Sequence, residues 1–383
     1  MGIEQFFNNL LKIDIFKNNS IYLNLNNKIK CNYVYIDFNS IIYNVVTQIE
    51  EDLNYLLYEL ILHVYDSQVV NQKAHSIAKK WNYAIVNDKS ILLEDYHKLM
   101  LTVNEDIIIE NIKKYLKNLI TTYFEISHLI KIYIAIDGIP TMSKIIEQKK
   151  RRYNGYILSG LKHKIFDNEY NNLSDKRKIY EKYKYGYDRN NLIAGSTLMQ
   201  KIYINLLNLD LSVKDYIVSG PEENGEGEKK IMEDVVLNKN KGTYCIYSPD
   251  ADVIILSIIL HSLLLENKID NTFKILRYDQ ITLTFNLIDI NIFLDNIIKY
   301  IQSKTTVNLD KIRLYLDISY IYTFFGNDFI PRIEAIDIKR DLILLIDIYI
   351  DALIINNDPY IIKYSINDNK YIINYSKLIY LIN

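Results

Sequence analysis

The sequence is poor in residues that cross-link a chain. Its 383 residues include only 2 cysteines, which is too few for a disulfide framework or a zinc site. Cys31 and Cys245 lie far apart, each beside an apolar run. We therefore expect both to be buried, reduced thiols.

Segments that would target the chain to a membrane are also missing. The longest mostly apolar run, Val253–Leu265, is too short to span a bilayer. The N-terminus, MGIEQFFNNLLKID, lacks the basic start and small-residue cleavage site of a signal peptide. Phe6 stands where a myristoylation signal needs Ser or Thr. We expect a soluble intracellular protein, cytoplasmic or nuclear, that has no membrane partner.

An excess of positive charge is absent as well. Lys and Arg total 45 against 47 Asp and Glu, which gives a formal net charge of −2. With no overall attraction to a polyanion, nucleic-acid binding would need a local basic patch and metal ions. The abundance of Asn, Ile, Lys and Tyr is typical of an AT-rich genome, so a single residue of these types carries little functional weight.

Strand-like runs alternate with helical patterns along much of the chain. The predicted strands are Asn32–Asp37, Lys131–Asp137, Tyr216–Gly220, Thr243–Tyr247 and Thr272–Tyr278. Predicted helices follow the first four of them, up to about Tyr65 and over Thr141–Leu161, Glu226–Leu237 and Asp252–Leu265. This order predicts an α/β fold with a mostly parallel central sheet that is flanked by helices.

Residues 66–103 and 166–191 break this pattern, and we interpret both as surface insertions. The second interleaves Lys and Arg with Tyr, which favours either an RNA contact or a solvated, partly disordered loop. Beyond residue 328 the sequence predicts further helices and a hairpin near Tyr360–Ile373.

Acidic residues follow four of the predicted strands. They are Asp37, Asp137, Glu226, Glu228, Asp250 and Asp252. The carboxyl ends of parallel strands share one edge of a sheet, so these acids should meet there. Packed carboxylates repel each other unless cations balance them, and oxygen ligands favour Mg²⁺ or Mn²⁺. Two such ions would suit phosphodiester hydrolysis.

The spacing of the acids supports a metal site. Gly227 separates one acidic pair and Ala251 the other, which lets the backbone turn tightly and direct both acids inward. Either pair alone is also typical of a helix cap. Asp328 lies in the apolar segment FFGNDF, where a charge needs a partner or a metal.

A basic helix face follows Asp137. Its residues are spaced i, i+4, i+7 and i+8, and they are Lys144, Gln148, Arg151 and Arg152. Guanidinium groups hold phosphate oxygens through paired hydrogen bonds, so this face favours phosphate binding. A solvated basic helix is the alternative.

These segments resemble the XRN family of 5′→3′ exoribonucleases. The matching motifs are MGIEQFF, YIDFNSII, AIDGIP, the spacing of the basic helix, IAGSTLM, SGPEENGEGEKKIM, YSPDADVIIL and FFGNDFIPRI. They occur in the family's order across roughly 330 residues, which makes a chance match untenable.

The resemblance implies a fold and a set of roles. The fold would be a nuclease core related to PIN domains and flap endonucleases. The six acids and Asp328 match the metal-site acids, which hold two Mg²⁺ or Mn²⁺ ions. The basic face matches the pocket for the 5′-monophosphate of single-stranded RNA. Family enzymes remove 5′-mononucleotides one at a time from such RNA.

Two departures from the family stand out. Tyr43 occupies the place of a histidine that stacks on a base, and a tyrosine ring can stack as well. Family enzymes normally continue into a second conserved region, whereas this sequence ends soon after Asp328. We expect a nuclease domain over residues 1–335, then a helical extension over 336–383 that starts a truncated second region. Three alternatives are open for that region: the chain is naturally minimal, it is split, or a partner protein completes it.

Two other functions remain open at this point. A flap endonuclease acting on DNA shares the acids, but it usually carries a glycine-containing hairpin after the last metal aspartate, and no glycine follows Gly326. An inactive relative that binds RNA is the other, although unused clustered carboxylates would destabilise the fold.

Overall fold

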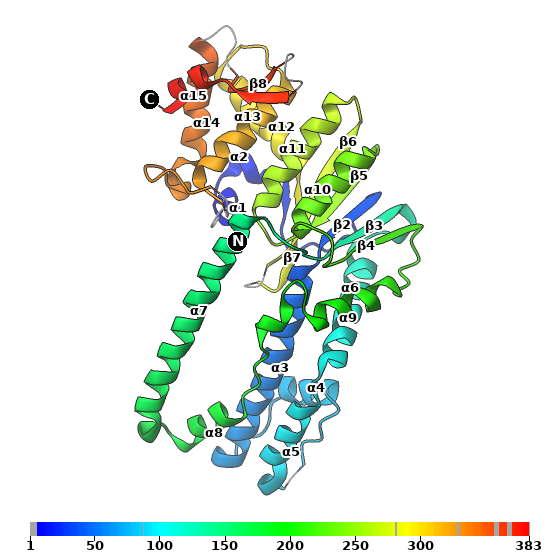
Figure 1. Cartoon of the computed structure of the whole chain (residues 1–383), viewed down its shortest axis with the longest axis vertical. Helices are drawn as coiled ribbons and strands as arrows, with labels where there is room; N and C mark the ends of the chain where they lie inside the picture. Colours follow the sequence, from blue (N-terminus) through cyan, green and yellow to red (C-terminus); the bar gives the residue numbers. More distant parts are fainter. Residues whose placement is uncertain are drawn as a thin grey trace.

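The centre of the molecule is a seven-stranded sheet in the order β1-β7-β6-β5-β2-β3-β4 (Figure 1). The computed structural model describes residues 6–86, 88–279, 282–327, 330–355, 360–365 and 370–382. The strands are β1 (Ile21–Tyr22), β2 (Tyr33–Asp37), β3 (Lys131–Ala135), β4 (Asp215–Ser219), β5 (Gly242–Tyr247), β6 (Asn271–Asp279) and β7 (Thr284–Asp289). Strands β2 to β6 pair in parallel, which confirms the predicted sheet. The antiparallel edge formed by β7 and β1 was not predicted.

Helices connect the parallel strands and cover both faces of the sheet. Between β2 and β4 the chain forms α3 (Asn39–Asp66), α4 (Gln72–Lys80), α5 (Lys89–Thr102), α6 (Glu105–Tyr123), α7 (Met142–Glu169), α8 (Asp175–Tyr183) and α9 (Thr197–Leu207). Then follow α10 (Gly227–Asn238), α11 (Asp252–Glu266), α12 (Ile290–Lys304), α13 (Lys311–Tyr322), α14 (Ile338–Ile355) and α15 (Tyr375–Ile382). Two short helices, α1 (Phe6–Leu10) and α2 (Asp14–Lys17), precede β1.

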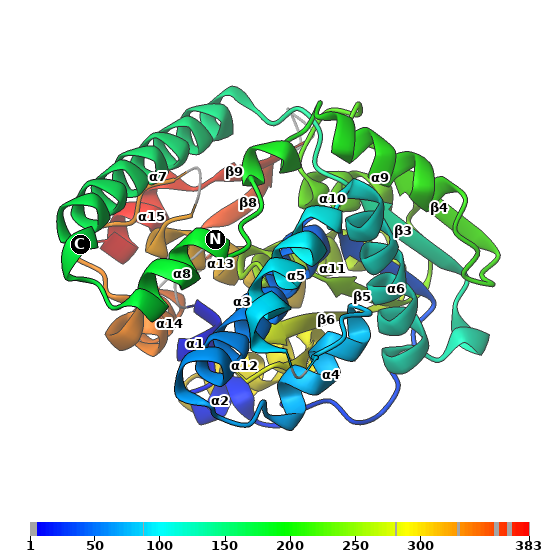
Figure 2. The same cartoon turned by 90° about the horizontal axis from the view of Figure 1, so that it is seen from below.

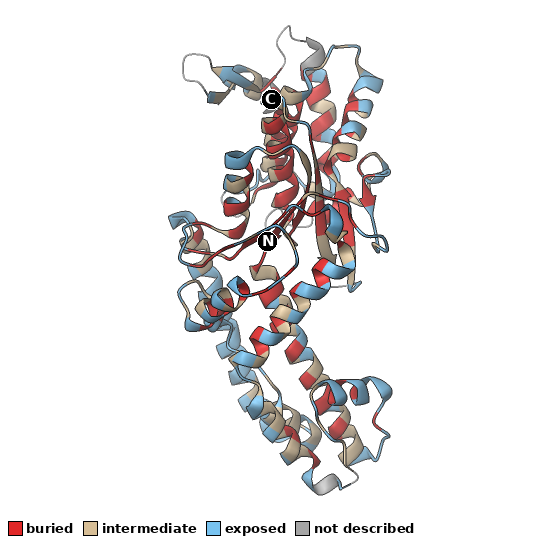
Figure 3. Cartoon of the chain, turned by 90° about the vertical axis from the view of Figure 1, so that its right-hand side faces the viewer, coloured by how far each residue is buried: buried red, intermediate tan, exposed pale blue. Residues whose placement is uncertain are grey.

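The alternation of side chains along the strands creates two hydrophobic cores. On β2, Tyr33 and Tyr35 face the core formed with α10 to α14, whereas Val34 and Ile36 face the core formed with α3, α6 and α9. All four side chains are buried. Figure 3 shows the buried residues gathered on the sheet and on the helix faces that cover it. Burial on both faces explains why the central strands are continuous apolar runs.

Strand β2 lies where the chain order of the sheet changes direction. The chain continues from β2 to β3 and β4 on one side, and later to β5 and β6 on the other. The crevice outside the carboxyl ends of the strands at such a point is the usual ligand site of an open α/β sheet. Asp37, the last residue of β2, lies at this point.

The segments that interrupt the strand pattern are largely helical. Ala74, Ile77, Leu92 and Tyr96 from residues 66–103 are buried in the same core as α3. Within residues 166–191, helix α8 also packs on α3. The second segment is therefore helical over α8, and Tyr180, Tyr183, Tyr185 and Tyr187 are partly buried against the core that includes α3, whereas Tyr170 is exposed.

The C-terminal part packs onto helix α13. The predicted hairpin is confirmed as β8 (Ile362–Ser365) paired with β9 (Lys370–Ile373). Asp317 on α13 accepts hydrogen bonds from the Ile361 and Ile362 amides and from the Tyr349 hydroxyl. No described helix is long and apolar enough to cross a membrane.

Helix α7 stands apart from the other helices. Only Lys144 is buried among its residues, and Figures 1 and 2 show the helix as a long arm that leads from the sheet edge to α8. Helix α3 leaves the same edge and reaches α8 at its far end. Two long helices therefore connect the carboxyl edge of the sheet with α8.

Candidate active site

Two aspartates lie at the carboxyl ends of neighbouring strands. Asp37 ends β2 with 9% of its surface exposed, and its Oδ2 accepts a hydrogen bond from Ser248 Oγ at 3.0 Å. Asp137 follows β3 by two residues. Its Oδ2 accepts a hydrogen bond from Asn39 Nδ2 at 2.7 Å. The structure thus brings the two predicted acids to one edge of the sheet.

Helix α10 begins directly against these aspartates. The Gly227 amide donates a hydrogen bond of 2.7 Å to Asp137 Oδ1. A Cβ atom at Gly227 would lie 2.8 Å from Asp37 Oδ1, closer than side chains tolerate. The glycine is needed for this close approach, rather than for the tight turn that the sequence predicts. The flanking acids, Glu226 and Glu228, consequently start the helix beside Asp37 and Asp137.

The third pair of acids follows β5. The Asp250 amide donates a hydrogen bond to Ser248 Oγ at 3.2 Å, and Asp252 is the first residue of α11. Ser248 therefore contacts both Asp37 and the loop that carries Asp250. This shared hydroxyl links the carboxyl ends of β2 and β5.

The acids influence one another's ionisation. Burial raises the pKa of Asp37 well above its usual range, and the nearby charges of Asp137 and Asp250 raise it further. Burial also raises the pKa of Asp137, although the Gly227 amide and two lysines oppose this. Carboxylates that disfavour one another's charge in this way need a cation for all of them to ionise.

Glu228 shows the largest effect of this environment. Burial, followed by the charges of Asp37, Asp250, Asp252 and Glu226, raises its pKa to about 9. Its buried Oε2 has no hydrogen-bond partner among the described residues. A buried carboxylate oxygen without a partner is unfavourable for the protein alone, and it fits a position where a ligand or ion completes the site.

The predicted metal site is only partly described. Asp328 lies outside the described residues. Within the described ranges, no group of three or more acidic, histidine or cysteine side chains lies close enough together to hold a metal ion. The charges of neighbouring acids nevertheless raise the pKa values of Asp37 and Glu228, so these acids are close enough for their charges to interact.

The predicted basic helix face starts at the acidic cluster. Lys144 is 5% exposed, and its Nζ lies 3.5 Å from Glu226 Oε1. Gln148, one turn later, is partly buried, whereas Arg151 and Arg152 are exposed. Arg151 lies 3.9 Å from Glu147 on the same helix. The structure therefore places Lys144 among the acids and leaves the two arginines open to solvent.

Tyr43 lies near the start of α3, six residues after Asp37. Its side chain is 41% exposed, so its ring is available for stacking.

Sequence reasoning missed two cations near the acids, Lys230, which is buried, and Arg277, which is half-buried. Lys230 donates hydrogen bonds to the carbonyl oxygens of Ile136 and Gly220, so it fixes α10 against the ends of β3 and β4. Arg277 on β6 is affected by the charge of Asp250, and burial lowers its pKa to about 10. Arg277 Nη1 is buried without a hydrogen-bond partner among the described residues. Nothing in their sequence surroundings distinguishes these residues from other lysines and arginines.

Comparison with known proteins identifies similar sequences. Residues 70–279 match the family described as XRN 5′-3′ exonuclease N-terminus. A protein of Acanthamoeba polyphaga mimivirus, named as a candidate 5′-3′ exonuclease, is 30% identical over 230 residues, which cover 54% of this chain and 34% of that protein. Human 5′-3′ exoribonuclease 1 is 26% identical over 278 residues, which cover 66% of this chain and 16% of the human protein.

A fungal relative is also similar over part of its length. The 5′-3′ exoribonuclease 2 of Yarrowia lipolytica is 25% identical over 252 residues, which cover 54% of this chain and 24% of the relative. The matches thus cover about a third or less of these three relatives.

Proposed function

The chain belongs to the XRN 5′-3′ exonuclease family, and on that premise we propose that it is a metal-dependent 5′→3′ exoribonuclease. Its substrate would be single-stranded RNA with a 5′-monophosphate. Water would be added across the bond between phosphorus and the 3′-oxygen of the first nucleotide. This step releases a 5′-mononucleotide and leaves a new 5′-phosphate on the shortened strand.

The observation that carries this proposal is the acidic edge of the sheet with Lys144 beside it. The charges of acids that follow neighbouring strands raise the pKa values of Asp37 and Glu228. The Lys144 ammonium, which starts the basic face, lies 3.5 Å from Glu226. A site for phosphodiester hydrolysis and a site for a terminal phosphate would therefore adjoin each other.

The donor atoms fit a hard divalent cation. All the proposed ligands are carboxylates, which suit Mg²⁺ or Mn²⁺, and Glu228 Oε2 lacks a partner from the described residues. Two ions would be held by Asp37, Asp137, Glu226, Glu228, Asp250, Asp252 and Asp328. Such ions supply an activated water and balance the charge on the leaving oxygen.

The chain's own residues would position the strand. Lys144, Gln148, Arg151 and Arg152 would bind the 5′-phosphate, and Tyr43 would stack on a base. Ser248 and Asn39 hold the Asp37 and Asp137 carboxylates in place through hydrogen bonds of 3.0 and 2.7 Å. The cationic side chains of this face would then balance the charge of the 5′-phosphate before hydrolysis begins.

A degradation assay tests this function. One 3′-labelled single-stranded RNA would carry a 5′-monophosphate, a 5′-hydroxyl or a 5′-triphosphate, with a matched DNA flap beside it. We expect Mg²⁺-dependent release of mononucleotides from the monophosphate RNA alone, because only that end matches the basic face. EDTA and the Asp250→Ala substitution should abolish it.

A matched control separates the site from general damage. Asp270, at the opposite end of the sheet, has an 80% exposed side chain, so Asp270→Asn should keep full activity. Internal RNA fragments would contradict binding of the 5′ end, and cleavage of the flap would favour a DNA nuclease. A chain inactive on every substrate would favour an RNA-binding relative or one that requires a partner.

A further inference from the structure

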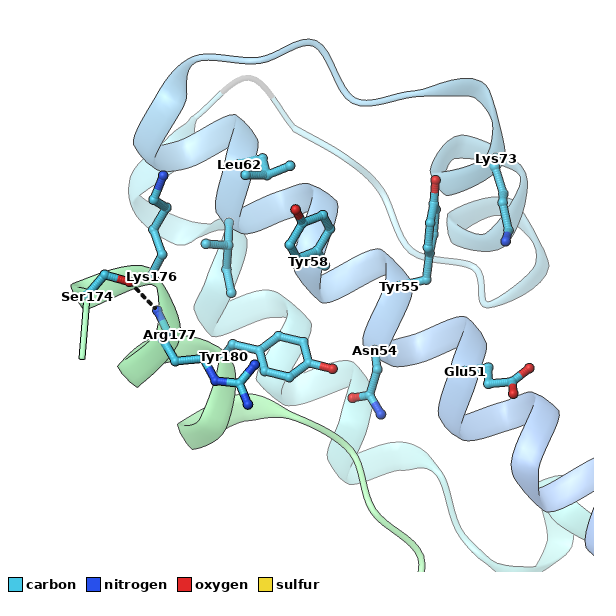
Figure 4. A pocket seen from close by; sticks show the side chains of 11 residues that line it. Glu51, Asn54, Tyr55, Tyr58, Leu62, Lys73, Ser174, Lys176, Arg177 and Tyr180 are labelled. Carbon is cyan, nitrogen blue, oxygen red and sulfur yellow. Dashed lines mark hydrogen bonds between the residues drawn. The ribbon is translucent and has the colours of Figure 1, made fainter. Parts of the chain in front are cut away.

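A cavity lies between α3 and α8, far from the acidic edge (Figure 4). Its volume is about 710 Å³. Three tyrosines, Tyr55, Tyr58 and Tyr180, line it together with Lys73 and Arg177. Aromatic rings combined with cations are the typical surface for single-stranded nucleic acid, because every base has a flat face and every nucleotide a phosphate.

The aromatic rings are accompanied by cations at short range. Lys73 Nζ lies 4.3 Å from the centre of the Tyr55 ring, and the Arg177 guanidinium lies 5.5 Å from that of Tyr180. Tyr58 lies between these two pairs, and 51% of its surface is exposed (Figure 4). A base stacked on Tyr58 would therefore have a cation near it on either side.

The walls of the cavity are fixed by hydrogen bonds. Asn54 on α3 exchanges two hydrogen bonds with the backbone of Tyr185, at 2.9 and 2.8 Å. The Tyr187 amide donates to Glu50 Oε1 at 2.7 Å, and Lys176 pairs with Asp66 at 2.7 Å. These contacts hold α8 against α3. The cavity is therefore formed before a ligand arrives, which limits the entropy lost on binding.

The ion pairs around the cavity leave room for a phosphate. Arg177 lies 2.6 Å from Glu181, one turn later on the same helix, and its side chain is 56% exposed. Exposed pairs of this kind contribute little, so a phosphate can compete for the guanidinium. Lys73 forms no ion pair within the described part of the chain, so its charge is also open to a ligand.

The position of the cavity relates it to the proposed active site. Helix α3 begins at Asn39, beside Asp37, and reaches Tyr58 after about 28 Å at a rise of ~1.5 Å per residue. At ~3.4 Å per stacked nucleotide, this distance corresponds to roughly eight nucleotides. A strand with its 5′ end at the acids could thus reach the cavity with a later nucleotide.

We propose that the cavity between α3 and α8 is a second nucleotide-binding site, which stacks a downstream base of the single-stranded substrate on Tyr58 and holds its phosphate with Lys73 and Arg177. This proposal rests on the proposed exoribonuclease function for the direction of the strand. The contact would keep the RNA on the enzyme between successive cleavages.

Binding without catalysis tests the site directly. The full chain would be titrated in EDTA against a fluorescent single-stranded RNA of about twenty nucleotides, long enough for both sites, and one of about four, too short to reach the cavity. Removing a stacking ring weakens binding by roughly tenfold or more. We expect Tyr58→Ala to weaken binding of the long RNA by roughly tenfold and to leave binding of the short RNA unchanged.

The matched control is Tyr65→Ala, a tyrosine on the same helix that is 46% exposed and does not line the cavity. It should bind both RNAs like the wild type. Thermal unfolding of both variants would confirm that the exposed substitutions leave the fold intact. Equal binding of the long RNA by the wild type and Tyr58→Ala would overturn the site, as would weakening by Tyr65→Ala of the same size.

The activity assay separates this proposal from the proposed function. Cleavage of the short 5′-phosphorylated RNA depends on the acidic edge alone. If the wild type cleaves the short RNA and Tyr58→Ala leaves binding of the long RNA unchanged, only the cavity proposal fails. If no RNA is cleaved but Tyr58→Ala still weakens binding of the long RNA, the cavity proposal stands and the proposed function fails.

Discussion

Asp317 is a fully buried acid and Glu228 is a half-buried acid with a buried oxygen, Oε2, and the two differ in their hydrogen-bond partners. Burial is the main cause that raises both pKa values, to about 6 for Asp317 and about 9 for Glu228. Asp317 accepts three hydrogen bonds, from the Tyr349 hydroxyl and from two backbone amides, at 2.6 to 2.9 Å. Glu228 Oε2 receives none from the described residues.

From this difference we infer that Asp317 is structural and that Glu228 belongs to the proposed metal site. The direction of the pKa shift is the same at both sites, so it does not distinguish them. The supply of donors does, because a fold that uses an acid for stability also provides its hydrogen-bond partners. The acid without partners is the one that a metal ion or substrate would complete. Substitutions should therefore affect folding at Asp317 and activity at Glu228.

The largest effect should follow from Glu228→Gln. We expect the RNA degradation rate to fall by a factor on the order of 10³, because the amide removes a negative charge from the proposed metal site. In EDTA the variant should unfold at no lower temperature than the wild type, since the neutral amide avoids a charge that burial disfavours. The rate would be followed on 5′-phosphorylated RNA, and stability by thermal unfolding.

Asp270→Asn again serves as the control for this substitution, because its exposed side chain should leave both readouts unchanged. A Glu228→Gln enzyme with full activity would contradict the comparison. So would a marked loss of stability in EDTA, which would make Glu228 a structural acid like Asp317.

Asp317→Ala should lower stability and keep activity, which is the opposite of what we expect for Glu228→Gln. Three buried donors would lose their acceptor at a cost of ~1–3 kcal/mol each, and removal of the buried charge would offset part of that cost. We expect the free energy of unfolding to fall by roughly 3–4 kcal/mol at neutral pH, with activity per folded molecule retained. Urea unfolding measures the first and active-site titration the second. Normal stability with lost activity would reverse the assignment.

The pH dependence of stability gives a finer test at the same residue. The pKa of Asp317 is raised from 3.8 to about 6, so the folded state holds this proton more tightly than the unfolded state. The stability that protonated Asp317 gives to the folded state is fully present below pH 3.8 and is lost as the pH rises through 6.

Relative to Asp317→Asn, the wild type should therefore lose roughly 2–3 kcal/mol of stability between about pH 4 and pH 7. Urea unfolding of both proteins at several pH values in this range measures the difference. A difference that stays constant, or grows in favour of the wild type as the pH rises, would show that Asp317 is not protonated by burial.

The sequence predicted one of these two sites and not the other. Strand-end acids are visible in a sequence because parallel strands bring their carboxyl ends together, and Asp37 and Asp137 lie as expected. Asp317 looks like any helical acid, since its donors come from residues more than 30 positions later in the chain. The partial burial of Arg277 and the packing of α8 on α3 likewise depend on tertiary contacts that no local pattern contains.

Residues of helix α7 should also differ in whether they affect stability or substrate selection. Lys144 is buried beside Glu226, whereas Arg151 is exposed and lies 3.9 Å from Glu147 in a surface pair of the kind that contributes little to stability. We expect Arg151→Ala to change the free energy of unfolding by less than about 0.5 kcal/mol. Its preference for 5′-monophosphate over 5′-hydroxyl RNA should fall roughly tenfold, because a charge-assisted hydrogen bond to the phosphate is lost.

Competitive degradation of the two RNAs measures this preference, and Lys149→Ala, an exposed cation on the same helix outside the predicted face, is the matched control. An equal loss in both variants would mean that α7 attracts RNA through its overall charge. An unchanged preference in Arg151→Ala would separate the exposed arginine from the 5′-phosphate and leave Lys144, beside the acids, as the remaining cation of the predicted face that could select the terminal phosphate together with Arg152.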